Sequence, residues 1–131
     1  MARFVIDPGV GIHLAAEQIR VNPDHELLAP TLFRSQTLSI THEAVLRGEL
    51  NDAEAVERLE QLWKLNVRLL GDAVLRRTAW KVASQFAWPQ TYDAEYLALT
   101  QLQGDAFVTL DPGLAELASQ VVKVATVDDL R

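Results

Sequence analysis

Two short apolar runs in this sequence end in the same tripeptide, Asp-Pro-Gly. The first is Phe-Val-Ile, followed by Asp7, and the second is Phe-Val-Thr-Leu, followed by Asp111. Short apolar runs that stop at proline and glycine are typical of buried strands. Proline also pre-sets the backbone of a first helical residue. The two tripeptides therefore predict strands at residues 4–6 and 106–110, each leading directly into a helix.

The rest of the chain alternates helical patterns with strand-like runs. Apolar β-branched runs predict further strands at residues 67–70 and 121–126. Amphipathic spacing predicts helices between them. The first helix is expected over residues 10–20 and the second from Pro30 onward. Asn51 or Asp52 should cap the third, the fourth should end near Pro89, Thr91 should cap the fifth, and a short sixth helix is expected at 114–118.

This alternation predicts an α/β fold, a three-layer α/β/α sandwich around a central parallel sheet. At 131 residues the chain is most simply one domain, residues 1–131, and it is long enough to bury a substantial core. No internal repeat, low-complexity tract or linker divides it.

Composition excludes several classes of site. With no cysteine, the chain has no disulfide framework and no thiolate metal ligand or nucleophile. The net charge of −6 argues against a non-specific nucleic-acid coat, although it allows a local basic face. No apolar run approaches the roughly 20 residues that span a bilayer, and no signal peptide is apparent. We therefore expect a cytoplasmic protein.

Three aspartates mark a candidate site. Ligands of parallel α/β sheets bind at the carboxyl ends of the strands. Asp7 and Asp111 are expected at that edge, and Asp93 lies in the first turn of the helix after Thr91. Each also has a simple structural role, because aspartate is a good N-cap and a first-turn carboxylate complements the helix dipole. The residues alone leave both interpretations open.

Gln36 is a polar residue on an apolar face. It follows Phe33 by three positions and Leu32 by four, so it shares their side of the helix. A glutamine there is either hydrogen-bonded within the core or part of a polar site.

Four segments resemble the PIN domain, and within it the VapC-type toxins of toxin–antitoxin modules. They are FVID at 4–7, LLAPTLFRSQ at 27–36, TYDAEYLAL at 91–99 and FVTLDPGLA at 107–115. The resemblance runs essentially end to end. It implies a metal-dependent endoribonuclease with an acidic quartet, of which Asp7, Asp93 and Asp111 match three members. Gln36 falls where the family usually has glutamate, and Gly9 where it tends to carry serine or threonine.

The resemblance implies Mg²⁺ or Mn²⁺ as cofactor, held by Asp7, Asp93 and Asp111, because hard cations prefer oxygen ligands. Such a cation activates water for attack on an RNA phosphodiester. Gln36 completes the expected catalytic set with an uncharged amide. The implied partners are RNA, a second copy of the chain in a homodimer, and an antitoxin protein. The alternative is a degenerate PIN domain with weak or no nuclease activity, which binds RNA or protein.

A basic cluster lies elsewhere in the chain. Arg76, Arg77 and Lys81 flank Trp80 and are suited to hold phosphates. The simpler interpretation, which we expect, is a solvated helix face with Trp80 packed against a neighbour. Surface positions are also expected for Glu43, Glu95 and Asp105, and a position near the rim of the site for Arg34. A phosphatase or a nucleotide-binding α/β domain is disfavoured because no glycine-rich phosphate loop with a lysine is present.

Overall fold

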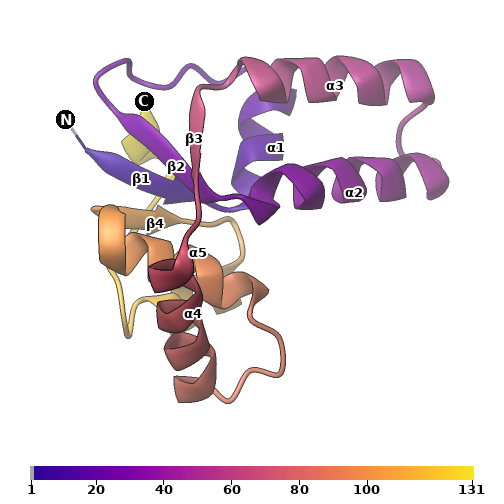
Figure 1. The fold of residues 1–131 in the computed structure, drawn as a ribbon. Coiled ribbons are helices and arrows are strands. Elements are labelled where there is room, and N and C mark those ends of the chain that lie inside the picture. Colours follow the sequence, from indigo (N-terminus) through magenta and orange to yellow (C-terminus); the bar gives the residue numbers. More distant parts are fainter. Residues whose placement is uncertain (1) are drawn as a thin grey trace.

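The computed structural model describes residues 2–131 and contains a five-stranded sheet in the order β3-β2-β1-β4-β5 (Figure 1). Every neighbouring pair in the sheet is parallel. The strands are β1 (Arg3–Ile6), β2 (Glu26–Pro30), β3 (Val67–Leu70), β4 (Ala106–Val108) and β5 (Val124–Ala125). The α/β class and the parallel sheet that the alternating pattern predicts are confirmed.

Helices cover the sheet on both sides, which gives the three expected layers. α1, α2 and α3 pack together on one side, and α4 and α5 lie on the other (Figure 1). Among residues 2–131, no helix is both long enough and apolar enough to cross a bilayer. The helices are α1 (Pro8–Ala16), α2 (Leu32–Leu46), α3 (Asp52–Lys64), α4 (Ala73–Gln85), α5 (Tyr92–Gln103), α6 (Pro112–Ala118) and the 3₁₀ helix η1 (Val127–Leu130).

The prediction for Pro30 is wrong. Pro30 does not begin a helix but ends β2, where it is buried and lies opposite Leu70 of β3. The three residues before it are buried as well, so this stretch is an inner strand with apolar side chains on both faces. α2 begins two residues later, at Leu32. β4 and β5 are also shorter than the expected 106–110 and 121–126.

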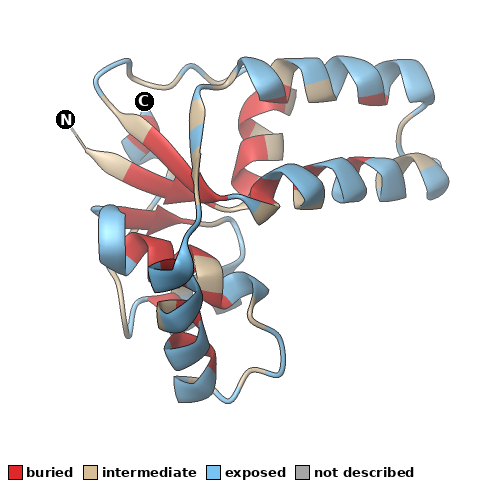
Figure 2. Ribbon diagram, viewed as in Figure 1, coloured by how far each residue is buried: buried red, intermediate tan, exposed pale blue. Residues whose placement is uncertain are grey.

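The core lies on both sides of the central strands. Buried residues are concentrated on the inner strands and on the helix faces next to them (Figure 2). Val5 and Phe107 are register partners in the β1–β4 pair and are completely buried. α5 contacts β1, β2 and β4 on one side and α4 on the other. Because it is enclosed from both sides, α5 buries the consecutive residues 96–100 instead of a single stripe.

α1 approaches α2 and α3 closely at Gly11. A Cβ atom at this position would lie 2.7 Å from the Phe33 ring and 3.3 Å from Leu62. Only glycine leaves room for this approach. The three helices can therefore pack as one layer.

α3 begins as the sequence predicts and packs differently. Asn51 caps it, and Glu54 completes a capping box by accepting from the Asn51 backbone N–H. Among the apolar residues of α3, Leu62 is buried, whereas Val56 is 56% and Trp63 63% exposed. The turn between α2 and α3, with the start of α3, projects beyond the sheet (Figure 1), whereas Trp63 lies at the other end of α3, next to β3.

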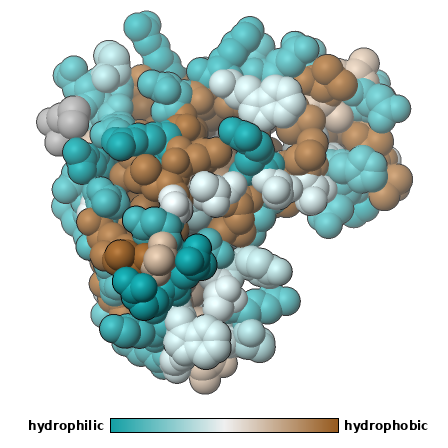
Figure 3. Space-filling view, viewed as in Figure 1, coloured by the Kyte–Doolittle hydropathy of each residue, from teal (hydrophilic) through white to brown (hydrophobic). Residues whose placement is uncertain are grey.

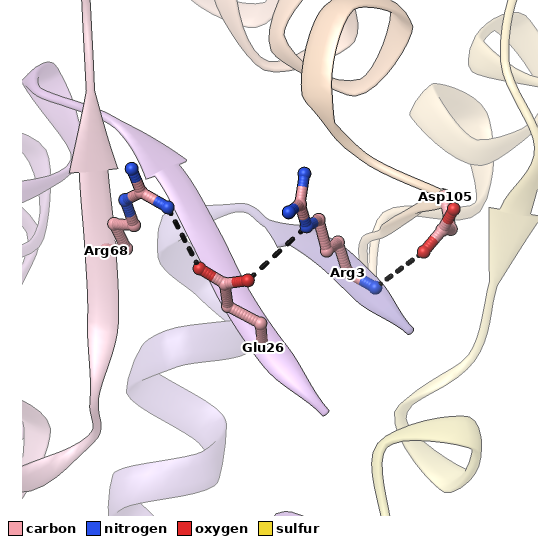
Figure 4. Close-up of polar contacts among 4 residues, drawn as sticks. All are labelled: Arg3, Glu26, Arg68 and Asp105. Carbon is pink, nitrogen blue, oxygen red and sulfur yellow. Dashed lines mark hydrogen bonds and ion pairs between the residues drawn. The ribbon is translucent and has the colours of Figure 1, made fainter. Parts of the chain in front are cut away.

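A chain of charged groups crosses the amino-terminal edge of the sheet (Figure 4). Glu26 on β2 pairs with Arg3 of β1 at 3.4 Å and with Arg68 of β3 at 3.3 Å. The backbone N–H of Arg3 donates to Asp105 Oδ2 at 2.7 Å. These contacts tie three neighbouring strands, and the turn before β4, at the edge opposite the candidate site.

Candidate functional site

The candidate site lies where the strand order reverses. β1 pairs with β2 on one side and with β4 on the other, which makes the gap between β1 and β4 the switch point of the sheet. Asp7 follows β1 directly, and its backbone N–H donates to the Val108 carbonyl at 3.3 Å. Asp111 follows β4 after two residues. Both aspartates therefore lie at the carboxyl edge that the sequence predicts.

Asp7 is the most enclosed of these carboxylates. It is the N-cap of α1, where its Oδ1 accepts from the Val10 N–H at 2.9 Å. Its other oxygen, Oδ2, accepts from the Thr109 hydroxyl at 2.5 Å. Burial raises its pKa, the two hydrogen bonds oppose the rise, and the charges of Asp93 and Asp111 add to it.

Asp111 is the N-cap of α6. Its Oδ1 accepts from the N–H groups of Gly113 at 2.9 Å and Leu114 at 3.2 Å. The helix-capping role expected for the two Asp-Pro-Gly tripeptides is therefore present at both. It accounts for one oxygen of each carboxylate, so it does not exclude a second role for the other oxygen.

Thr109 links these two aspartates. Its hydroxyl donates to Asp7 and accepts from the backbone N–H of Asp111 at 3.1 Å. Thr109 is not among the site residues predicted from the sequence. The available signal was its place two residues before Asp111, in the Thr-x-Asp pattern of the last family-like segment.

Asp93 joins the cluster from a third element, as the second residue of α5. Partial burial of the carboxyl, and then the charge of Asp111, raises the pKa of Asp93, although the residue as a whole is accessible to solvent. Asp93 in turn acts on Asp7. The three predicted carboxylates are therefore close enough to repel one another.

Gln36 is half-buried on α2 and forms a specific hydrogen bond. The Tyr96 hydroxyl donates to its Oε1 at 2.7 Å, which joins α2 to α5. Burial raises the pKa of Tyr96, and the charges of Asp7, Glu95 and Asp93 add to the rise. Tyr96 and Gln36 thus border the acidic cluster. Like Thr109, Tyr96 is absent from the set predicted from the sequence.

The donor set suits a hard divalent cation in its chemistry, because every group offers oxygen. The repulsion between Asp7, Asp93 and Asp111 is also the kind that a cation relieves. Within residues 2–131, however, no three acidic or histidine side chains converge closely enough to hold a metal ion as placed. The carboxylates are electrostatic neighbours and do not form a finished coordination shell.

Other predicted positions fall outside the cluster. Glu43 is exposed, as expected, and Asp105 bonds to Arg3 at the opposite edge of the sheet. Glu95 is half-buried, and burial raises its pKa, so its expected surface position is only partly correct. Arg34 lines a pocket of about 370 Å³ between α2, α3 and β3, together with Trp63 and other apolar residues. None of the four predicted catalytic residues lines that pocket.

The expectation for Trp80 is wrong. It does not pack against a neighbouring element but is 71% exposed on α4. Arg76, Arg77 and Lys81 are exposed around it.

Comparisons with known proteins bear on the fold. No family model matches the chain, and no curated protein matches it. The chain is similar to the crystal structure of PAE2754 from Pyrobaculum aerophilum, with a TM-score of 0.76 and 20% sequence identity. The match covers 98% of this chain and 92% of that one. At this identity the likeness establishes a shared fold over nearly the whole chain.

Proposed function

We propose that this protein is a metal-dependent endoribonuclease of PIN/VapC type that uses Mg²⁺ or Mn²⁺, and that it is the toxin of a toxin–antitoxin module. The observation that carries the proposal is the electrostatic proximity of Asp7, Asp93 and Asp111 near the switch point of the sheet. They come from the ends of β1 and β4 and the start of α5, and they repel one another. Groups with such raised pKa values cluster at functional sites.

Each residue has a separate part in this function. Asp7, Asp93 and Asp111 would hold the cation, which, when bound, supplies an activated water and offsets charge on the phosphate. Thr109 acts as a positioning residue, because its hydroxyl fixes one oxygen of Asp7. Gln36 borders the site with an amide that brings hydrogen-bonding capacity and no charge.

The alternative is a degenerate PIN domain that binds RNA or protein without cleaving RNA. Two observations favour it. Gln36 replaces a charged ligand with a neutral group whose oxygen already accepts from Tyr96. In addition, Gly9 carries no hydroxyl near Asp7.

The deciding experiment titrates Mn²⁺ calorimetrically into the wild-type protein and into Asp111→Asn. Asparagine caps a helix about as well as aspartate, so this variant keeps α6 and loses only the charge. The proposal expects binding to the wild type and a large loss of affinity in Asp111→Asn. Asp24→Asn, at an exposed loop position, is the matched control and should bind as the wild type does.

RNA cleavage with Mg²⁺ or Mn²⁺ separates the two functions. The ribonuclease proposal expects wild-type cleavage that Asp7→Asn abolishes. If the wild type cleaves no RNA while Gln36→Glu does, the native chain is the degenerate form. In that case partner or RNA binding should survive the change at Asp7.

The proposed partners follow from the same assignment. They are an RNA substrate, a second copy of the chain in a homodimer, and an antitoxin. An arginine inserted among the carboxylates would form charge-assisted hydrogen bonds with them. Co-purification with the product of an adjacent reading frame, and the mass in solution, test these two protein partners.

A further inference from the structure

One face of α4 carries cations around an exposed tryptophan. We call it the basic face and define it as Arg76, Arg77, Trp80 and Lys81. α4 contains no aspartate or glutamate, and its only acidic neighbour in sequence is the N-cap, Asp72. None of the four ion pairs found among residues 2–131 includes a residue of the basic face. These three cations thus lack acidic partners in a chain whose net charge is −6.

The basic face lies opposite the packed side of α4. Leu75, Ala79, Val82 and Ala83 are buried, and α4 packs chiefly against α5. Trp80 points away from that contact and is 71% exposed. Arg76 and Arg77 lie one turn before it, at the i−4 and i−3 positions, so the indole has cations beside it. Hydrophilic side chains gather over α4 in the lower part of the molecule (Figure 3).

The second exposed tryptophan lies in different surroundings, on a helix that carries acidic residues. Trp63 on α3 is 63% exposed, but it lines the apolar pocket with Phe33 and Leu62. Its own helix also carries Glu57 and Glu60. Trp63 therefore lines a largely apolar pocket, which Arg34 also borders, whereas Trp80 is exposed on a helix whose charged side chains are all cations.

An aromatic ring among unpaired cations matches the chemistry of a single-stranded nucleic acid. Unpaired bases stack on exposed aromatic rings, and lysine and arginine pair with the phosphates. A duplex hides its base faces, so it cannot use Trp80 in this way. The position of α4 also suits a strand that continues toward the acidic cluster. The end of α4 leads through residues 86–91 into α5, whose second residue is Asp93.

We propose that the basic face binds single-stranded RNA, with a base stacked on Trp80 and phosphates paired with Arg76, Arg77 and Lys81. The choice of RNA over DNA rests on the ribonuclease function proposed above. The surface itself rests on the exposure of Trp80 and the unpaired cations. It is separate from the acidic cluster and needs no metal.

Binding is measured by fluorescence anisotropy with a labelled, unstructured oligouridine. EDTA is present, so that no metal-dependent cleavage occurs during the measurement. Trp80→Ala should weaken binding roughly 5- to 150-fold, the effect of losing one stacked base. Trp63→Ala is the matched control, an equally exposed tryptophan outside the face, and should bind as the wild type does. A blunt-ended RNA duplex of equal length, which has no unpaired loop, should bind the wild type more weakly and should be insensitive to Trp80→Ala.

Salt dependence tests the cations. Each of Arg76→Gln, Arg77→Gln and Lys81→Gln should reduce the slope of log K against log salt by about 0.7 for each phosphate that the variant no longer neutralises. Arg58→Gln, on the exposed surface of α3, should leave the slope unchanged. All these positions are exposed, so melting temperatures near that of the wild type will show that the variants fold.

Three outcomes would overturn the proposal: wild-type affinity in Trp80→Ala, an equal loss in Trp63→Ala, or equal binding of the duplex through Trp80. The two proposals fail separately. Asp7→Asn should keep oligouridine binding while losing cleavage. If the wild type binds oligouridine through the basic face but cleaves no RNA, only the ribonuclease function is refuted. If the wild type cleaves RNA but the basic-face variants bind oligouridine as the wild type does, only the RNA-binding role of the basic face is refuted.

Discussion

The Tyr96 hydroxyl donates a 2.7 Å hydrogen bond to Gln36 Oε1. Tyr96 is 1% exposed and its pKa is raised, so the hydroxyl keeps its proton throughout the physiological range. The amide oxygen of Gln36 is therefore already engaged at the position where the family resemblance implies a charged ligand. This bond explains how a neutral side chain is held in place at the border of the acidic cluster.

Gln36→Glu should make the metal-free protein less stable and its response to metal larger. A glutamate can accept the same bond from Tyr96, but it adds a negative charge near Asp7 and Asp93. In EDTA at pH 7 we expect a lower melting temperature than that of the wild type. When the same excess of Mn²⁺ is added to both proteins, we expect the melting temperature of Gln36→Glu to rise more than that of the wild type, because the variant binds the cation more tightly. A concentration of a hundred times the variant's dissociation constant stabilises it by about 2.7 kcal/mol.

Ser39→Glu is the control for that change, because it adds the same charge at an exposed position of α2. Its melting temperature should respond to Mn²⁺ as the wild type does. An equal Mn²⁺ response in Gln36→Glu and Ser39→Glu would contradict a role for position 36 in the site.

Asp7→Asn should raise stability at neutral pH. Because the folded state raises the pKa of Asp7 above its ordinary value of 3.8, ionisation favours the unfolded chain. Wild-type stability therefore falls as pH rises from the ordinary pKa through the raised one. The difference in melting temperature, variant minus wild type, should be near zero at pH 3 and positive at pH 7. A difference that does not change with pH would contradict this assignment.

Two glycines of α1 should respond in opposite ways to alanine. A Cβ at Gly9 would meet only Asp7 Oδ1, at 3.6 Å, so Gly9→Ala should gain roughly 0.5–1 kcal/mol of helix stability. Gly11→Ala should lose about 1–3 kcal/mol, because its Cβ would collide with the Phe33 ring. Urea unfolding of this matched pair measures both. The same space at position 9 admits Gly9→Ser, which supplies the hydroxyl that the resemblance implies.

Glu26→Gln should lower the free energy of unfolding only slightly. Glu26 bridges Arg3 and Arg68, but all three side chains are partly exposed, and surface ion pairs contribute at most about 1 kcal/mol each. Most of the loss should disappear in 1 M salt, which screens exposed charges. Unfolding at low and high salt measures it, with Glu49→Gln, the partner of Arg47, as a single-pair comparison. A large loss that salt leaves unchanged would show that the pairs are effectively buried.

The elements that could be predicted are those whose signal is local. β1 and β3 follow from their apolar runs, and Asn51 caps α3 as its chemistry suggests. β2 was missed because Pro30 also suits a helix start, and only its burial between two strands decides the matter. The exposure of Trp80 was missed for a related reason. Periodicity assigns a residue to one side of a helix but does not say whether another layer covers that side.

The candidate site could be predicted in part. Asp7 and Asp111 could be placed together because the carboxyl ends of parallel strands meet at one edge. Their partner Thr109 lies 102 residues after Asp7, and Tyr96 lies 60 residues after Gln36. Contacts of this kind depend on the register of the sheet and on how α5 packs against it. Neither can be predicted from a local sequence pattern.

The central place of β1 has a consequence for synthesis of the protein. β1 leaves the ribosome before the other four strands, yet one of its two neighbours is β4, and Asp105 lies 102 residues after its partner Arg3. Until residues 106–111 have emerged, β1 has an open apolar edge, and Asp7 lacks both the Thr109 hydroxyl and the nearby Asp111. The acidic cluster therefore cannot assemble on a short nascent chain. Any activity that depends on it is absent until residues 106–111 have left the ribosome.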